Sequence, residues 1–204
     1  MEEIDVRART VKLFGRDLQR DTLMCVCKAS FGCLFIINLL GLPYIMPFFK
    51  KYSGAPFLPS KHHSISGMLD NLPLSAARKS GERVLLDFGS GDGRIVFAAA
   101  KRGFSATGIE LNPWLYAYSY LRSYRLGGKF VLGNMWTKGP AIIRDTSPDV
   151  VTIYGLPGPV VAKFAEILSE NLDKNKETII VSNYFKIPKM RELGSFGDFY
   201  FYQI

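Results

Sequence analysis

The stretch LLDFGSGDGRIVFAAAKRGF, residues 85–104, decides the fold of this chain. Apolar residues lead to Asp87, glycine then recurs at 89, 91 and 93, and apolar residues return at helical spacing. This order predicts a buried β-strand, a tight loop and an α-helix. Because glycine lets the backbone turn sharply and lets a ligand approach main-chain atoms, the loop is a candidate binding site.

Strands and helices alternate through the rest of this region, from residue 83 to residue 204. The apolar runs predict strands at 83–88, 105–111, 129–134, 149–155, 178–185 and 198–204. The segments between them predict helices at 92–102, 113–126 and 157–171, with a short fourth at 188–193. Nearly continuous apolar strands separated by helices are typical of a parallel sheet that is covered on both faces.

Composition limits the function without selecting it. The chain has 204 residues, 48% of them hydrophobic, and a net charge of +8, which suits one globular domain with an appendage. The basic excess favours nucleic acid, anionic lipid or an acidic partner, or is simply a solvated surface. The three cysteines lie within one apolar stretch, so we expect neither a disulfide framework nor a metal site.

The composition divides the chain into four segments. Residues 1–21 form a polar tail, and 22–51 are predicted to be a hydrophobic, membrane-associated segment. Within it, residues 29–49 carry no charge and are long enough for a transmembrane helix, with a buried helix or hairpin as the alternative. Residues 52–82 are a linker and a helix at 64–72, which places Ile65, Met68, Leu69 and Leu72 on one face. Residues 83–204 form the main domain.

The loop pattern points to an adenosyl ligand without phosphates. A dinucleotide fingerprint needs glycine where Arg94 stands, and no Lys-Ser/Thr pair of a nucleotide P-loop is present. Glu110 ends the second predicted strand, where a carboxylate can accept hydrogen bonds from both hydroxyls of a ribose. The side-chain oxygen of Asn134 can accept a hydrogen bond from the amino group of an adenine. Met135 or Trp136 either packs on the adenine ring or packs in the core. S-adenosylmethionine fits this pattern, and the candidate cofactor-binding residues are Asp87, Gly89, Ser90, Gly91, Asp92, Gly93, Glu110, Asn134 and Met135.

The run GSGDGRIVFAAAKRGFSATGIELNPWL, residues 89–115, resembles a known enzyme family. It is similar to the mitochondrial protein-lysine N-methyltransferases that act on the ATP synthase c subunit and on the adenine nucleotide translocase, and is closer to the c-subunit enzyme. The resemblance extends upstream to APFLPS, residues 55–60, and covers roughly residues 30–204. The chain departs from the family at Asn134, where the family has an acid, and at residues 183–188, where the family has an Arg-x-Pro-x-Pro-like turn.

The resemblance implies a fold, a reaction and a location. The fold is a class I methyltransferase domain, seven-stranded and Rossmann-like, with a membrane-associated N-terminal segment. The reaction transfers methyl groups from S-adenosylmethionine, leaving S-adenosylhomocysteine, to a lysine of a mitochondrial inner-membrane protein, without a metal. The c subunit is the first expectation for the substrate and the translocase the second. The expected location is the inner membrane with the catalytic domain facing the matrix, in contact with membrane lipid and without nucleic acid.

An acceptor lysine must be neutral to react, so we expect an apolar, aromatic channel that lowers its pKa. The candidates for lining this channel are Tyr154, Tyr184, Phe185, Pro59 and Ser60, each of which has core packing as its alternative role. No acid or histidine follows the fourth predicted strand, so the sequence identifies no general base.

Three other functions compete with lysine methylation. A nucleic-acid methyltransferase would commonly carry Asn/Asp-Pro-Pro-Tyr after the fourth strand, where this chain has Tyr154-Gly155-Leu156-Pro157. A small-molecule or lipid methyltransferase would also use a membrane segment. A non-catalytic, membrane-anchored assembly factor would not need the acidic and glycine residues of the loop, which this chain retains.

Overall fold

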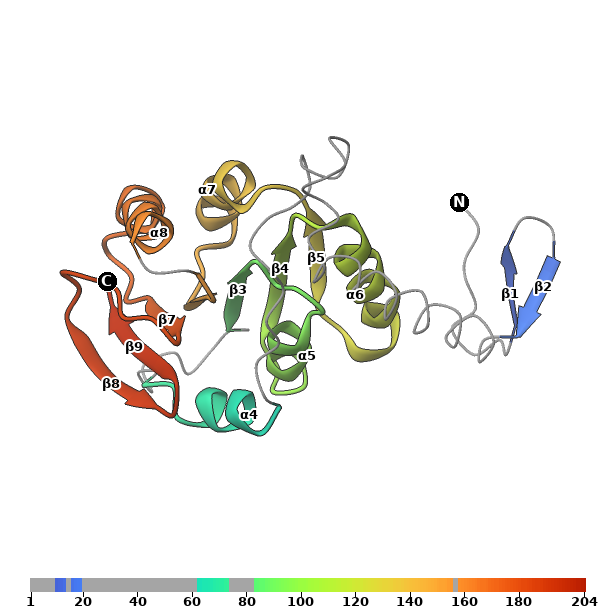
Figure 1. Cartoon of the computed structure of the whole chain (residues 1–204), viewed down its shortest axis with the longest axis horizontal. Coiled ribbons are helices and arrows are strands. Elements are labelled where there is room, and N and C mark those ends of the chain that lie inside the picture. Colours follow the sequence, from blue (N-terminus) through green and yellow to red (C-terminus); the bar gives the residue numbers. More distant parts are fainter. Residues whose placement is uncertain (1–9, 14–15, 20–61, 74–82, 156–157) are drawn as a thin grey trace. The chain divides into compact units, whose positions relative to one another are not determined.

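The structure is a computed structural model that describes residues 10–13, 16–19, 62–73, 83–155 and 158–204. The chain divides into two units, Met1–Pro56 and Phe57–Ile204. In the first unit, strands β1 (Thr10–Leu13) and β2 (Arg16–Gln19) pair as an antiparallel hairpin. The second unit contains the main sheet and its helices (Figure 1).

The main sheet has seven strands in the order β5-β4-β3-β6-β7-β9-β8. Five of them are parallel: β3 (Val84–Phe88), β4 (Ser105–Glu110), β5 (Lys129–Leu132), β6 (Val150–Ile153) and β7 (Ile179–Asn183). The last strand, β9 (Phe199–Gln203), runs antiparallel between β7 and β8 (Glu192–Phe196). The chain order reverses beside β3, which is where ligands bind in open parallel sheets.

Helices cover both faces of the sheet, as expected from its apolar strands. They are α4 (His62–Asp70), α5 (Arg94–Ala100), α6 (Pro113–Leu126), α7 (Met135–Thr146) and α8 (Pro159–Asn171). One core cluster joins α4 and α5 to one face, and a second joins α7 and α8 to the other. Neighbouring residues of a strand divide between the clusters, Leu85 facing the first and Leu86 the second, because side chains alternate along a strand.

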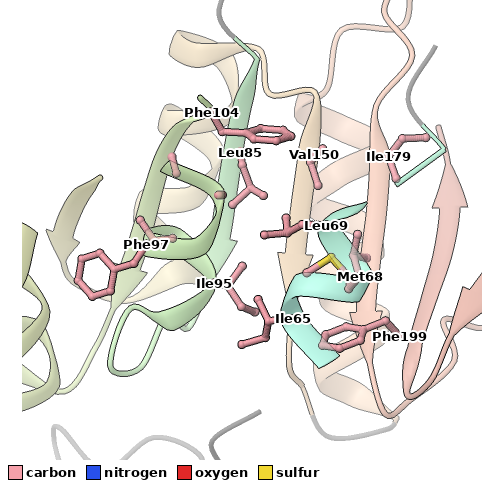
Figure 2. Close-up of a cluster of buried hydrophobic side chains, with 14 of the residues drawn as sticks. Ile65, Met68, Leu69, Leu85, Ile95, Phe97, Phe104, Val150, Ile179 and Phe199 are labelled. Carbon is pink, nitrogen blue, oxygen red and sulfur yellow. The ribbon is translucent and has the colours of Figure 1, made fainter. Parts of the chain in front are cut away.

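The helix predicted at 64–72 is confirmed as α4, and its apolar face lies against the sheet. Ile65, Met68 and Leu69 are all buried, and Figure 2 shows them in one cluster with Ile95, Val150 and Phe199. Gly67 lets α4 pack closely against Phe196 of β8, because a Cβ at this position would lie 2.2 Å from the Phe196 ring. The segment before the main domain therefore contributes to the same hydrophobic core.

Two predictions at the level of helices were wrong. The helix predicted at 188–193 does not form: Lys189 has a positive φ of 65°, and β8 begins at Glu192. Helix α7 was not predicted, because Gly139 and Pro140 interrupt its helical pattern. In the structure Gly139 is the residue that allows the helix to pack, since a Cβ there would lie 2.5 Å from the ring of Phe88.

The predicted membrane-associated segment, residues 22–51, lies outside the described residues. Among the residues that the structure does describe, none of the helices combines the length and the hydropathy that crossing a bilayer requires.

Candidate functional site

The loop between β3 and α5 carries the three glycines in left-handed conformations. Gly89, Gly91 and Gly93 have φ angles of 79°, 56° and 78°, which disfavour any residue with a side chain. The backbone N–H groups of Gly89 and Ser90 both donate to the carbonyl oxygen of Ile109, at 2.9 and 3.0 Å. These bonds hold the loop against the end of β4, so the loop is tied to the neighbouring strand as well as to its own.

Glu110, at the end of β4, fastens this loop with its carboxylate. Its Oε2 accepts a hydrogen bond from the backbone N–H of Gly91, and its Oε1 accepts one from the N–H of Asn112, both at 2.7 Å. Burial raises the pKa of the Glu110 carboxyl, and these backbone hydrogen bonds oppose the rise. Each carboxylate oxygen has a second lone pair, so Glu110 keeps acceptor capacity for a ligand.

Ser90 fills the space between the loop and β4. Its side chain packs on Gly108, where a Cβ would lie 2.6 Å from both the Cβ and the Oγ of Ser90. The Oγ is buried and has no hydrogen-bond partner among the described residues. A buried hydroxyl without a partner costs free energy unless a ligand or water satisfies it.

Asp92 and Ser119 complete the support of the loop. Asp92 forms a two-point ion pair with Arg94, with N–O distances of 2.8 and 2.6 Å. The hydroxyl of Ser119, on α6, lies 3.0 Å from the carbonyl oxygen of Gly91 and 2.9 Å from that of Leu115, so its one hydrogen is shared between the loop and the helix. Sequence reasoning missed Ser119, although a small polar residue among the buried positions of α6 was a usable signal.

Asp87 is buried in β3 beneath the loop. The Thr152 hydroxyl donates to its Oδ1 at 2.6 Å. Burial raises the pKa of Asp87 to about 7, the Thr152 hydrogen bond opposes the rise, and the charges of Glu110 and Asp92 add to it. Thr152 was also missed, although it is the one polar residue in the apolar strand VVTI.

Asp87 should make the stability of the folded chain depend on pH. Because its pKa is raised from 3.8 to about 7, its contribution is fully present below about pH 3.8 and is lost as the pH rises through about 7. We expect the free energy of unfolding of the wild type to fall by about 2–3 kcal/mol between about pH 5 and about pH 8, relative to that of Asp87→Asn. Urea unfolding at the two pH values measures this difference.

The exposed Asp145 supplies the matched control for this prediction. Asp145→Asn should follow the wild-type pH dependence. If the stability of Asp87→Asn also changes in parallel with the wild type, Asp87 is not the titrating group.

Asn134 and Met135 lie after β5, at the start of α7. Asn134 is the N-cap of this helix, and its side-chain oxygen accepts a hydrogen bond from the N–H of Trp136 at 2.9 Å. Asparagine is a favoured N-cap residue, which gives a structural reason for its presence here. Met135 reaches the glycine loop: a Cβ on Gly89 would lie 3.8 Å from its sulfur. Trp136 packs at the edge of the second core cluster, with Lys163 Nζ 5.5 Å from the centre of its ring.

Tyr154 and Tyr184 come together at the same edge of the sheet. Tyr154 follows β6 and Tyr184 follows β7, and their rings stack with centroids 5.6 Å apart and an interplanar angle of 14°. Strand β6 is the parallel neighbour of β3, so the tyrosine pair and the glycine loop both lie at carboxyl ends of adjoining strands. Burial, followed by the charges of Tyr184 and Asp198, raises the pKa of the Tyr154 hydroxyl.

A tight turn presents the Tyr184 ring. Tyr184 has a φ of 67°, unusual for a bulky residue, and the Phe185 N–H donates to the carbonyl oxygen of Asn183 across it at 2.9 Å. The Tyr184 N–H donates to the carbonyl oxygen of Asp198 at 2.7 Å, which fixes the turn to the start of β9. Strained backbone of this kind costs about 1–3 kcal/mol and is found most often at functional sites.

Three candidate residues of the acceptor channel remain. Phe185 is half-buried beside Tyr184, and Pro59 and Ser60 lie outside the described residues. Asp198, in the turn between β8 and β9, is an acid near the tyrosine pair that sequence reasoning did not identify. Within residues 62–73, 83–155 and 158–204, no cluster of His, Cys, Asp or Glu side chains forms a metal site.

The fold and the loop together define the class of the protein. The five parallel strands, the antiparallel β9 inserted before β8, and the acid–glycine loop after β3 are the features of a class I methyltransferase domain. The prediction of a Rossmann-like, seven-stranded methyltransferase fold is confirmed.

Comparison with known proteins identifies the family. The family described as ANTKMT methyltransferase domain matches residues 87–193, and the chain belongs to it. The ATP synthase c-subunit lysine N-methyltransferase of Caenorhabditis elegans is 33% identical over 158 residues, which are 73% of this chain and 80% of that protein. The protein of the same name from Mus musculus is 37% identical over 130 residues, 62% of this chain and 48% of that protein. The chain therefore spans about half the length of the mammalian relatives it matches.

A solved structure supports the class independently. The RNA methyltransferase of Salinibacter ruber, crystallised in complex with S-adenosyl-L-homocysteine, is 30% identical, with a TM-score of 0.58. The match covers 72% of this chain and 94% of that protein.

Proposed function

We propose that this chain is an S-adenosylmethionine-dependent protein-lysine N-methyltransferase whose acceptor is a lysine of the ATP synthase c subunit. The observation that carries the proposal is the stacked pair Tyr154 and Tyr184 beside the glycine loop, at one edge of the sheet. The names of the relatives from worm and mouse support the choice of substrate. The adenine nucleotide translocase is the alternative acceptor that the sequence resemblance implies.

The residues around the loop fit the proposed cofactor. The left-handed glycines leave the loop backbone open to close approach, and the buried Ser90 side chain supports the loop against β4. The free lone pairs of Glu110 suit a ribose diol, and Met135 is placed to pack on an adenine above Gly89. Asn134 already caps α7, so its second lone pair and its amide N–H₂ remain for the adenine. Asp87, Asp92 and Gly93 would act by shaping and charging this cradle.

The charge of the cradle also agrees with the cofactor. Asp87, Asp92 and Glu110 place three buried carboxyl groups at the loop; Arg94 pairs with Asp92, which leaves Glu110 and the ionised fraction of Asp87 to attract a cation. S-adenosylmethionine, when bound, supplies a methyl group on a positively charged sulfur, and its amino-acid end carries both an ammonium and a carboxylate group. A site rich in carboxyl groups favours such a cation by Coulomb attraction, which is strong where water is excluded.

The tyrosine pair would prepare the acceptor. A free lysine has a pKa near 10.4, so roughly one side chain in a thousand is neutral at pH 7.4. The rings of Tyr154 and Tyr184 exclude water from one side of an entering lysine, which disfavours its charged form. Their faces also accept the cationic methylated product.

Removing the Tyr154 ring should impair transfer without impairing cofactor binding. We expect Tyr154→Ala to lower kcat for methylation at least about 10-fold, because the acceptor amine loses an apolar wall that positions it. The affinity for S-adenosylhomocysteine should change less than about twofold, since the ring lies outside the loop. Tyr154→Phe keeps the ring and should retain most of the activity. If Phe is as poor as Ala, the hydroxyl rather than the ring carries the effect.

Intact-mass spectrometry of candidate substrates tests the proposal as a whole. Cells with and without this gene are compared, and the loss is rescued with the wild type or with Glu110→Ala. Loss of a mass increment of whole methyl groups from the c subunit, restored by the wild type alone, supports the proposal. Loss from the translocase instead would show that the substrate is wrong and the reaction right. No change in either protein would contradict lysine methylation of both and would favour a nucleic-acid or small-molecule acceptor.

The location follows from the substrate. A c-subunit lysine is reached at the mitochondrial inner membrane, so we propose that the chain acts there with its catalytic domain on the matrix side. The uncharged run at residues 29–49 would hold the chain at the membrane and in contact with lipid. Protease protection of a tagged chain in intact mitochondria and in mitoplasts tests this orientation.

A further inference from the structure

The outward face of α6 is unusually apolar. Within the described part of the chain, eight large hydrophobic residues are exposed, and four of them lie on this helix. We call these four the α6 aromatic face: Trp114, Tyr120, Leu121 and Tyr124, which are 41–53% exposed. Leu132, on the adjacent strand β5, is a fifth. Contiguous exposed apolar surface of this kind marks an interaction site more often than scattered single residues do.

The aromatic rings on α6 are ordered with respect to one another. Tyr116 stacks on Tyr120 with centroids 5.6 Å apart, and Tyr120 meets Tyr124 edge to face at 5.3 Å. The hydroxyl of Tyr124 donates to that of Tyr120 at 2.8 Å. The face is therefore a preformed ladder of rings with polar tips, and it would lose little side-chain entropy on binding.

The same region carries only positive charge. Residues 111–132, which span α6 and β5, contain no acid and three basic residues, in a chain with 18 acids. Arg122 is turned inward, with its guanidinium 4.8 Å from the centre of the Phe97 ring. The other two basic residues, Arg125 and Lys129, are exposed. An acid-free, basic region is complementary to a surface of negative charge.

We propose that the α6 aromatic face docks on an anionic lipid bilayer, with the helix lying in the plane of the interface. Trp and Tyr favour the boundary between headgroups and acyl chains, where one end of each ring is apolar and the other is wet. With 14 residues, α6 is about 21 Å long and too short to span a bilayer. A nucleic acid fits less well, because Arg125 and Lys129 are the two exposed basic residues of α6 and β5, whereas backbone binding needs several phosphate contacts.

Docking in this way would place the cofactor loop beside the membrane. The N-cap of α6 is Asn112, whose N–H bonds to Glu110, and Ser119 of α6 bonds to Gly91. The helix that meets the lipid is thus the helix that supports the loop. This inference does not rest on the proposed substrate, since it concerns where the domain sits and not what it methylates.

Tryptophan fluorescence tests the proposal in the full chain. The chain has two tryptophans, so Trp136→Phe leaves Trp114 as the sole reporter. Vesicles of phosphatidylcholine and phosphatidylglycerol, some with brominated acyl chains, are added. We expect the Trp114 emission to shift to the blue, to be quenched by the brominated lipid and to become protected from aqueous iodide. Because the readout belongs to one position, other segments that bind lipid do not produce it.

A reporter at the opposite edge of the sheet is the matched control. Leu193 is exposed on β8, and Leu193→Trp in a chain with Trp114→Phe and Trp136→Phe should stay accessible to iodide in the same vesicles. Leu121→Glu should lower the vesicle-dependent shift of Trp114 at least fivefold, and unchanged S-adenosylhomocysteine binding would show that the variant is folded.

Other outcomes overturn the proposal. Trp114 that stays accessible to iodide on vesicle-bound chain, or a chain that binds no vesicles, excludes lipid docking by this face. Protection without lipid that grows with protein concentration indicates a second copy of the chain, and protection independent of concentration indicates another segment of the same chain. A shift that requires an RNA oligonucleotide in place of vesicles indicates nucleic acid.

Discussion

Replacing Glu110 by glutamine is expected to weaken the binding of S-adenosylhomocysteine at least about 100-fold, or about 3 kcal/mol. Both carboxylate oxygens accept backbone N–H groups, from Gly91 and from Asn112. In glutamine one oxygen becomes an N–H₂ group, so two donors face each other in a buried site, and one N–H is left without a partner. The loop should open at Gly91, where the ligand is proposed to bind. Isothermal titration calorimetry measures the affinity.

The same substitution at Glu166, which is exposed on α8 and is not part of the loop, is the matched control. Glu166→Gln should bind S-adenosylhomocysteine as the wild type does. If Glu110→Gln binds within about threefold of the wild type, the carboxylate neither fastens the loop nor contacts the ligand, and both assignments fail together.

Adding one methyl group at Gly108 is expected to weaken the same binding at least about 10-fold. Gly108 has ordinary backbone geometry in β4, so alanine strains nothing locally. Its Cβ, however, would lie 2.6 Å from the Ser90 side chain, far inside van der Waals contact. Ser90 and the loop must move away from β4, because a strand within the sheet cannot. Gly108→Ala therefore tests whether the position of the loop matters for binding, because it leaves the loop's own glycines unchanged.

A second substitution should relieve the effect. Ser90→Gly removes the atoms that collide, so Gly108→Ala with Ser90→Gly should bind more tightly than Gly108→Ala alone. Gly194→Ala, on β8, is the control, since nothing lies within 4 Å of a Cβ there. Equal affinity of Gly108→Ala and the wild type would contradict the close contact, and a double variant no better than the single one would place the strain elsewhere.

The parts of the fold that local patterns specify were predictable. The run from Leu85 to Phe104 identified β3, the loop and α5, because strand, glycine and helix signals follow each other without ambiguity. The apolar spacing of Ile65, Met68 and Leu69 identified α4 and the side it buries. Glu110 was identified as part of the site from its distance to the glycines, and the structure places its carboxylate against the loop.

The parts that depend on packing were not predictable. Helix α7 forms although Gly139 and Pro140 weaken it, because the small Gly139 lets the helix lie against Phe88. The structural use of Glu110 was missed since the sequence does not show that the Gly91 N–H points at it. The approach of Asp198 to Tyr154 depends on β9 pairing with β7, a contact between distant residues that no local pattern contains. Site residues that come from one local motif were therefore found, and those joined by tertiary pairing were not.

The placement of β9 has a consequence for how the chain folds during synthesis. The strand is translated after β8, yet it occupies the position between β7 and β8. Until β9 emerges from the ribosome, β7 is an edge strand whose five residues, all buried in the finished sheet, are open to pairing with other chains. We expect the nascent domain to be prone to aggregation until β9 has paired with β7. Ribosomes stalled shortly before β9 should accordingly yield a product that aggregates, whereas the released chain should resist proteolysis.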